Sequence, residues 1–350
     1  MQVTVLHCPF GPASAMPPSS LRWDESQMPS QHGRLIIVTG ANAGLGFSTS
    51  FGFARAGGHV ILACRNETRG AEAERKINDQ CQGDEDSVGK AEYMQLDIGS
   101  MQSVREFASA FKTRFSGRRL DILVLNAGVK AVEYGETVDG FEQQFGVNHL
   151  GHFALVLIAL LLPVMKMDAS GTADVQPARV VSISSISHHG SSLDMKQLSV
   201  KPKNYDAMSA YRASKLANLL FAYELHRRLE KCGISPTQVL SVACHPGVTE
   251  SNLLPNLAST YNSVIIKAII GFVHWLPWAQ SNAQGALNIL CCATDPNVVG
   301  GEFIGPHGLS EFYGWPRTVA SSKQSISLDK ARQLWEESER LTGIKFSVKD

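Results

Sequence analysis

The 350-residue chain lacks an excess of charge of either sign, since 32 Lys and Arg residues balance 32 Asp and Glu residues. A neutral chain lacks the basic surface that nucleic acid binding requires, so no nucleic acid partner is expected. Cysteine is also sparse, and the seven residues include no C-x-x-C pair. This excludes a disulfide framework or a cysteine zinc site and is typical of a reducing compartment. We expect the cytoplasm, with import into an organelle left open.

The chain also lacks a long apolar run. A membrane-spanning helix needs ~20 apolar residues, whereas the stretch Phe153–Met167 is shorter and Val264–Trp278 is interrupted by a lysine, a histidine and a proline. We therefore expect no transmembrane span, although the second stretch could contact a membrane surface. The first 33 residues show neither periodicity nor a secretory signal, which predicts a flexible N-terminal extension.

What the chain does contain is an alternation of short apolar runs with longer helical patterns. Continuous apolar runs indicate strands that are covered on both faces, as in a parallel sheet. We predict a single α/β domain over residues 34–345, a Rossmann-type doubly wound parallel sheet of about seven strands with helices on both faces. The expected strands are Leu35–Thr39, His59–Ala63, Glu92–Leu96, Asp121–Leu125, Arg179–Ser184, Val239–Cys244 and Val299–Ile304. The expected helices are Leu45–Ala56, Glu67–Asp79, Ser100–Phe115, Phe141–Met167, Ala207–Glu230, Gln280–Ala293 and Leu328–Leu341.

A glycine-rich turn follows the first expected strand and precedes a helix. Its three glycines, in T-G-x-x-x-G-x-G, have distinct physical roles. Gly40 permits a tight turn, Gly44 lets backbone amides approach a pyrophosphate, and Gly46 lets the helix pack closely on the strand. The positive end of the helix then faces the phosphates, which predicts a dinucleotide site.

This spacing resembles that of the short-chain dehydrogenase/reductase family. Four further motifs support the resemblance over about 270 residues, each near the end of an expected strand or on the following helix. They are N-A-G at 126–128, S-I-S-S at 182–185, Y-x-x-x-K at 211–215 and H-P-G at 245–247. The run V-N-H-L-G-H-F at 147–153 and A-C-R-N at 63–66 narrow the resemblance to the branch of retinol dehydrogenases, WW-domain-containing oxidoreductase and protochlorophyllide reductase.

The chemistry of a tyrosine and a lysine at this spacing suits hydride transfer. Reduction of a carbonyl leaves an alkoxide that must be protonated, but a tyrosine with an unperturbed pKa near 10 is a poor base at neutral pH. Lys215 lies on the same helical face as Tyr211, so its charge is expected to lower the pKa of the tyrosine. Ser185 is expected to donate to the substrate oxygen. The resemblance implies that Asn148 is a fourth catalytic residue.

Other residues compete for some of these roles. Ser184 is the alternative to Ser185, and the resemblance favours the second serine of the pair. Tyr205 is the alternative to Tyr211, but no lysine follows it four residues later. The histidine pairs at 149 and 152 and at 188 and 189 have no third ligand at metal-site spacing, so packing or polar contacts explain them better than a metal does.

The end of the second strand predicts which cofactor binds. An acidic residue there would bind the ribose hydroxyls of NAD, whereas Arg65 is placed to bind the 2′-phosphate of NADP(H). The resemblance implies further cofactor contacts, with Thr249 as an alternative to Ser251. Together with Tyr211 and Lys215, the expected cofactor-binding residues are Gly40, Asn42, Gly44, Leu45, Gly46, Arg65, Asp97, Ile98, Asn126, Ala127, Gly128, Pro246, Gly247 and Ser251.

The sequence thus predicts an NADP(H)-dependent oxidoreductase that interconverts a carbonyl and an alcohol. The apolar stretch at about 251–279 predicts a lid over a small apolar substrate; an oligomer interface or a membrane contact is the alternative use of this stretch. A non-catalytic nucleotide-binding protein on the same fold is the alternative function, and a dehydratase or epimerase is a smaller one. A monomer or a homodimer is expected.

Overall fold

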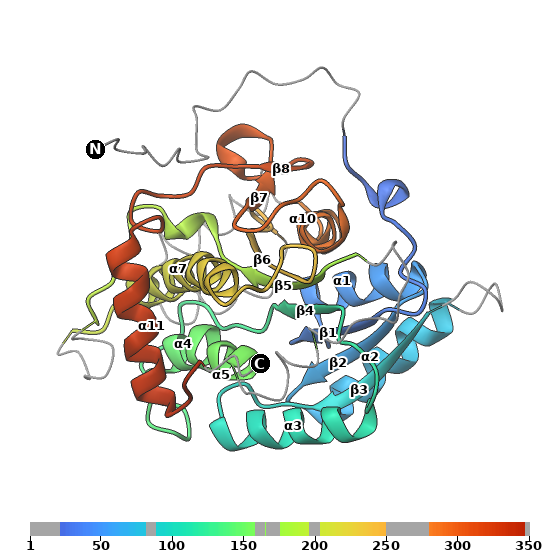
Figure 1. Ribbon diagram of the computed structural model, residues 1–350, viewed down its shortest axis with the longest axis horizontal. Helices are drawn as coiled ribbons and strands as arrows, with labels where there is room; N and C mark the ends of the chain where they lie inside the picture. Colours follow the sequence, from blue (N-terminus) through green and yellow to red (C-terminus); the bar gives the residue numbers. More distant parts are fainter. Residues whose placement is uncertain are drawn as a thin grey trace, which may run out of the picture.

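The computed structural model describes residues 22–81, 89–157, 165, 176–195, 204–249 and 280–346. They form an eight-stranded sheet in the order β3-β2-β1-β4-β5-β6-β7-β8 (Figure 1). Neighbouring strands are parallel, except that β8 is antiparallel to β7. The strands are β1 Leu35–Thr39, β2 His59–Cys64, β3 Lys90–Gln95, β4 Ile122–Leu125, β5 Ala178–Ile183, β6 Val239–Cys244, β7 Phe303–Pro306 and β8 Pro316–Thr318.

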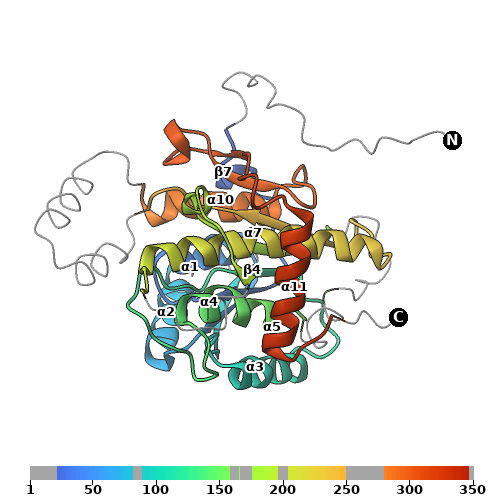
Figure 2. The same cartoon turned by 90° about the vertical axis from the view of Figure 1, so that its left-hand side faces the viewer.

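Helices cover both faces of the sheet. Helices α1, α2 and α10 lie on one face and α3, α5 and α7 on the other, while α11 packs against α7 (Figures 1 and 2). None of the described helices is long and apolar enough to cross a membrane. The helices are α1 Gly44–Arg55, α2 Glu67–Cys81, α3 Met101–Arg114, α4 Gln143–Phe145, α5 Gly151–Leu157, α7 Ala207–Lys231, α10 Asn282–Thr294 and α11 Leu328–Thr342, with a π-helical turn at Gly146–Leu150 between α4 and α5.

The two faces of the sheet explain the continuous apolar strands. In β1, Leu35 and Ile37 pack with α3, α5 and α7, whereas Ile36 and Val38 pack with α1, α2 and α10. All four side chains are fully buried, so successive residues of one strand contribute to two cores. This confirms the predicted doubly wound sheet with helices on both faces.

The structure adds one strand to the seven that were predicted. Strand β8 has three residues and begins with a proline, so it carries no apolar run that a sequence pattern could reveal. The last predicted strand, Val299–Ile304, is observed as β7 a few residues later. The predicted helix Phe141–Met167 starts at Gln143 and contains the π-helical turn. Residues 158–164 and 166–175 are outside the described part of the chain.

The N-terminal segment is more closely packed than expected. Trp23 is buried in the same core as α1 and α2, and Gln31 is fully buried with its N–H donating to the carbonyl of Ala56. Residues 22–33 therefore contact the sheet domain, because Trp23 gives this polar segment an apolar anchor. The rest of the expected extension, residues 1–21, and the expected lid at 251–279 lie outside the described residues.

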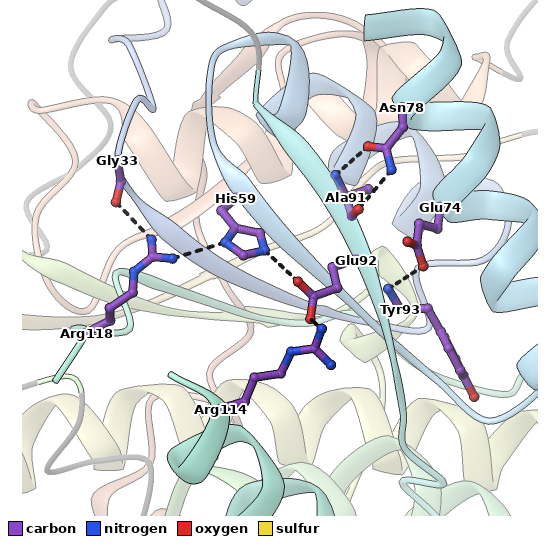
Figure 3. A network of polar contacts seen from close by, with 9 residues as sticks. All are labelled: Gly33, His59, Glu74, Asn78, Ala91, Glu92, Tyr93, Arg114 and Arg118. Atoms are coloured by element: carbon purple, nitrogen blue, oxygen red, sulfur yellow. Dashed lines mark hydrogen bonds and ion pairs between the residues drawn. The ribbon is translucent and has the colours of Figure 1, made fainter. Parts of the chain in front are cut away.

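Strand β3 forms an edge of the sheet, and side chains of α2 cover its free backbone groups (Figure 3). The Asn78 amide accepts from the N–H of Ala91 at 2.8 Å and donates to its carbonyl at 3.0 Å. Glu74 accepts from the N–H of Tyr93 at 2.9 Å. These side chains take the place of a neighbouring strand, which protects an edge that could otherwise pair with another chain.

Replacement of Asn78 by alanine should therefore destabilise the protein. The N–H and the carbonyl of Ala91 would lose their partners, and each such loss costs about 1–3 kcal/mol when the group is buried. Chemical denaturation of Asn78→Ala measures the change, with Gln80→Ala, an exposed position on the same helix, as the matched control. Equal stability of the two variants would contradict the edge-covering role.

Candidate active site

The carboxyl ends of β1, β4, β5 and β6 meet at one edge of the sheet. The glycine-rich turn follows β1, the N-A-G turn follows β4, Ser185 follows β5 and the H-P-G turn follows β6. Strands β1 and β4 are neighbours at the point where the strand order reverses, which is where doubly wound sheets bind ligands. The fold thus brings together four motifs that are far apart in the sequence.

Two of the three glycines are required by close packing. Gly40 has a φ of +65°, and a Cβ there would lie 2.9 Å from the Cα of Ala127. A Cβ on Gly46 would lie 2.3 Å from the carbonyl oxygen of Gly40. Gly44 has a φ of +56° but open surroundings, since the nearest atom to its Cβ would be the Asn282 side-chain oxygen at 3.8 Å. The turn is tight around Gly40 and open at Gly44.

Helix α1 begins at Gly44 without a side-chain cap, because the preceding residue is Ala43. Helices α3, α7, α10 and α11 each begin after a serine or aspartate whose side chain accepts from the first turn. Uncapped N–H groups at the positive end of a helix suit a phosphate. Asn42 and Leu45, both partly buried, lie beside this end. The turn therefore fits the pyrophosphate of a dinucleotide.

The hydroxyl of Thr39 joins the N-A-G turn to the π-helical turn. It accepts from the N–H groups of Asn126 and Ala127, each at 2.9 Å, and lies 2.9 Å from Nε2 of His152. Nδ1 of His152 lies 3.1 Å from the carbonyl of Asn148, so Nδ1 carries the proton and Nε2 accepts from Thr39. Burial lowers the pKa of His152 to about 4, which keeps the ring neutral.

Asn148 lies in the π-helical turn, fully buried, and its amide also holds the chain after β4. Its oxygen accepts from the N–H of Val129 at 2.8 Å, and its nitrogen donates to the carbonyl of Val129 and to the hydroxyl of Ser214, both at 2.9 Å. A Cβ on Gly128 would lie 3.0 Å from the amide oxygen. Asn148 thus links the N-A-G turn to α7, and π-helical turns often occur at functional sites.

Ser185, Tyr211 and Lys215 lie together at the end of β5. The Ser185 side chain lies near enough to the Tyr211 hydroxyl to lower the pKa of the tyrosine. Nζ of Lys215 lies 5.9 Å from the centre of the Tyr211 ring and donates to the carbonyl of Ile183 at 3.2 Å. Both Tyr211 and Lys215 are buried, and they project from adjacent turns of α7. The structure therefore assembles the three side chains that the sequence analysis selected.

The two alternative residues have other partners. The hydroxyl of Ser184 donates to the backbone carbonyl of Lys215 at 2.8 Å and is buried there. The hydroxyl of Tyr205 donates to Glu142 and accepts from Gln144, each at 2.7 Å. These contacts position α7 against neighbouring segments, which favours Ser185 and Tyr211 as the reactive pair.

Burial has the largest effect on the pKa values of this group. It raises the pKa of Tyr211, and the hydrogen bond from Ser185 only partly opposes this. Burial also lowers the pKa of Lys215 to about 8, and the charge of Lys130 acts in the same direction. The structure therefore differs from the expectation that Lys215 holds the pKa of Tyr211 below its usual range, because desolvation dominates. Tyr211 retains its proton at neutral pH.

The residues expected to bind the adenosine half of the cofactor follow β2 and β3. Arg65 is exposed directly after β2, and no carboxylate in the described part of the chain forms an ion pair with it. Asp97 accepts from the N–H of Gly99 at 3.0 Å. Ile98 is buried, and its carbonyl oxygen would lie 1.9 Å from a Cβ on Gly151, so this turn packs tightly on α5. The guanidinium of Arg65 is available to an external anion.

The H-P-G turn after β6 is held by two side chains from later segments. Gly247 N–H donates to Nδ1 of His245 at 3.3 Å, so Nε2 carries a proton and donates to Glu311 at 3.0 Å. Burial acts to raise the pKa of Glu311, but the hydrogen bond from His245 and the nearby charge of Arg317 oppose it and the pKa is lowered. The amide of Gln280 donates to the carbonyl of Pro246. These contacts fix the backbone where the nicotinamide is expected.

Of the two residues expected to bond the nicotinamide amide, the structure describes only Thr249. Thr249 forms an isolated bridge with Gln280, and its methyl group would lie 2.4 Å from a Cβ on Gly285 in α10. Ser251 lies outside the described residues.

Three of the four conspicuous histidines make polar side-chain contacts, and the fourth packs against a neighbouring ring. His152 bonds Thr39 and Asn148 as described, and His149 bonds the hydroxyl of Ser338 on α11 at 2.9 Å. His188 donates to the carbonyl of Ser185 at 2.7 Å and accepts from a backbone N–H at 3.1 Å, while His189 packs on its ring. In the residues that the structure describes, no group of three or more His, Cys, Asp or Glu side chains could hold a metal ion.

Sequence reasoning missed several residues that shape the site. Thr39 is the first residue of the glycine motif, so the motif could have pointed to it, but the sequence did not predict the contacts of its hydroxyl. His152 was considered only as a partner of His149. Gln280 could not be found from the sequence, because it is far along the chain from the H-P-G motif that it contacts. Lys130 follows the N-A-G motif closely, but a lysine at that position does not by itself predict a contact with Tyr211.

Comparisons with known proteins agree with this geometry. Residues 34–262 match the sequence profile of the family described as short chain dehydrogenase. Human WW domain-containing oxidoreductase is 39% identical over 316 residues, which is 88% of this chain and 68% of that protein. Mouse retinol dehydrogenase 13 is 36% identical over 317 residues, which is 90% of this chain and 85% of that protein.

Solved structures show the same fold. An uncharacterized protein from Mycobacterium paratuberculosis is 33% identical with a TM-score of 0.71, over 93% of this chain and all (100%) of that one. The complex of Pseudomonas aeruginosa RhlG with NADP is 23% identical with a TM-score of 0.56, over 78% of this chain and 94% of that one.

Removal of the Thr39 hydroxyl should loosen the site. Thr39→Val keeps the shape but leaves two N–H groups without an acceptor, which should cost about 1–3 kcal/mol of unfolding free energy for each group and weaken dinucleotide binding. Thr39→Ser keeps the hydroxyl and loses only a methyl group, so it should cost about 1 kcal/mol. Denaturation and dinucleotide titration of both variants measure the difference. A serine variant that is as unstable as the valine variant would refute the role of the hydroxyl.

Proposed function

Because the chain belongs to the short-chain dehydrogenase/reductase family, we propose that it is an NADP(H)-dependent oxidoreductase that interconverts a carbonyl and an alcohol on a small apolar molecule. The observation that carries the proposal is the grouping of buried Tyr211 with Lys215, one helical turn along α7 and 5.9 Å from its ring, and with Ser185 beside its hydroxyl. This group lies at the same sheet edge as the uncapped start of α1.

The residues around the edge fit a dinucleotide. The first turn of α1 at Gly44 would hold the pyrophosphate, and the turns at Asn126–Gly128 and Pro246–Gly247 would line the nicotinamide half. The N-A-G turn is held in place by Thr39 and Asn148. When bound, the nicotinamide supplies or accepts the hydride. We propose that these residues belong to one domain over residues 34–345, with the stretch at 251–279 as a substrate lid.

Tyr211 is the proton donor for the reductive direction. Its pKa is raised by burial, so the hydroxyl is protonated at neutral pH and can donate to an alkoxide. Ser185 lies beside this hydroxyl and can donate to the same substrate oxygen, which stabilises the charge that develops there. Lys215 places a positive charge 5.9 Å from the ring and would stabilise the phenolate that remains.

The cofactor preference rests on Arg65. It follows β2, where an acidic residue would serve NAD, and its guanidinium has no ion-pair partner in the described part of the chain. A phosphate oxygen can accept from such a guanidinium at two points. RhlG was solved with NADP, but at 23% identity it supports only the fold. An apolar substrate agrees with the names of the retinol dehydrogenase relatives.

The proposal is tested by the absorbance of NADPH with a panel of apolar aldehydes, ketones and quinones. Tyr211→Phe keeps the ring and removes the proton, so turnover should fall by at least ~10²-fold while NADPH still binds. Tyr223→Phe is the matched control, because Tyr223 is a buried tyrosine on the same helix that bonds Ser321 instead. NADPH binding without turnover of any carbonyl would favour the non-catalytic alternative, and normal turnover by Tyr211→Phe would rule out Tyr211 as the donor.

Replacement of Arg65 should weaken the binding of NADPH but not that of NADH. Only NADPH carries the 2′-phosphate, so Arg65→Ala should weaken its binding by about 1.5–3 kcal/mol, roughly 10- to 150-fold, and leave NADH nearly unchanged. Fluorescence titration with each cofactor measures this, with Arg75→Ala on α2 as an exposed control. A wild-type preference for NADH would overturn the cofactor assignment, and equal losses for both cofactors would give Arg65 a structural role.

A further inference from the structure

A second lysine faces the ring of Tyr211. Lys130 lies two residues after the N-A-G turn, and its Nζ is 5.4 Å from the centre of the Tyr211 ring. Nζ of Lys215 is 5.9 Å from the same ring. Two ammonium groups therefore lie within 6 Å of one tyrosine ring, a distance at which a cation is attracted by the ring face. Lys215 is accounted for by the proposed chemistry, whereas Lys130 is not.

The backbone holds Lys130 in place from both sides. Val129, before it, is bonded through both its N–H and its carbonyl to the amide of Asn148. Ala131, after it, is buried with a φ of +50° and donates its N–H to the amide oxygen of Gln144 at 2.8 Å. A left-handed conformation is unfavourable for alanine, and strained backbone of this kind is found where a ligand is held.

Gln144 is itself anchored. It is fully buried, and its nitrogen donates to the carbonyl of Ala207 at 2.8 Å and to the hydroxyl of Tyr205 at 2.7 Å. The loop that carries Lys130 is thus tied to the start of α7, the helix that carries Tyr211. The backbone around Lys130 is therefore held by the same elements that position Tyr211.

The charge of Lys130 lacks a partner within the described residues. No carboxylate forms an ion pair with it there, and burial lowers its pKa with no acidic side chain acting in the opposite direction. The charge of Lys130 also contributes to the lowered pKa of Lys215. A partly buried cation beside a second cation is unfavourable unless an anion accompanies them.

We propose that Lys130 binds a carboxylate on the substrate, so that the substrate class is an oxo-acid or the corresponding hydroxy-acid with an otherwise apolar body. A carboxylate carries one negative charge, which matches the one ammonium that the proposed reaction leaves unused. The carbonyl oxygen is bound at the Tyr211 hydroxyl and the ammonium lies over the ring of the same residue, so the carboxylate stands near the carbonyl in the molecule. This inference rests on the proposed function and narrows its substrate.

The test compares linear oxo-acids of graded length with their methyl esters, at saturating NADPH. In the wild-type protein, kcat/KM should be higher for the short oxo-acids than for their esters by about 10- to 100-fold, the range expected for a charge-assisted contact. Lys130→Met should remove this preference through KM of the acid, whatever change it makes to the rates with both substrates through Lys215. Lys130→Arg should restore most of it. Lys112→Met, an exposed position on α3, is the matched control.

Three results would overturn the inference. They are equal rates for acid and ester in the wild-type protein, an equal fall in kcat for both substrates in Lys130→Met with a shifted pH profile, and a weaker binding of NADPH by that variant. The second would mean that Lys130 acts only through Tyr211 and Lys215, and the third that it holds the cofactor.

Failure of the proposed function can be recognised separately. If the wild-type protein reduces no carbonyl compound, calorimetric titration of the NADPH-bound protein with a short hydroxy-acid still measures carboxylate binding. Binding by the wild-type protein that is lost in Lys130→Met would support the site alone, and binding by neither would overturn it.

Discussion

The single hydroxyl of Thr39 is the contact on which the arrangement of the site depends. Its oxygen accepts from Asn126 and Ala127, and its proton lies between His152 at 2.9 Å and the carbonyl of Val124 at 3.3 Å. The other nitrogen of His152 donates to the carbonyl of Asn148. The glycine-rich turn, the N-A-G turn and the π-helical turn are thereby joined at one point. Since Thr39 is fully buried, water cannot replace any of these partners, and the geometry of the edge is set by the core of the sheet.

Burial also determines the chemistry of the reactive group. Desolvation acts on Tyr211 and Lys215 in opposite directions, because it disfavours the charged form of each. The tyrosine is kept as an acid and the lysine becomes easier to deprotonate. A second ammonium, that of Lys130, strengthens the positive potential around the same ring. A site built in this way favours the development of negative charge, which both the alkoxide and a carboxylate would bring.

The two ends of the sheet domain are stabilised by different means. At β3, side chains of α2 bond the free edge directly. Beside them, Glu92 bonds His59 at 3.1 Å and Arg114 at 2.6 Å, as Figure 3 shows. At the other end, β8 is short, antiparallel and begins with a proline, which makes it a poor template for a further strand.

The sequence alone determined seven of the eight strands, the helices and the motif residues at their ends. A strand such as Leu35–Thr39 is apolar throughout because both its faces are covered, and Tyr211 and Lys215 share a helical face because of their spacing. These are local properties, so a pattern of neighbouring residues reports them. The strand order, the contact of Thr39 with His152 and the position of Lys130 over Tyr211 join residues about 80 to 110 positions apart. Only tertiary structure decided them, because contacts at that separation depend on how the whole sheet is assembled, and the sign of the pKa change at Tyr211 depends on the burial that this assembly produces.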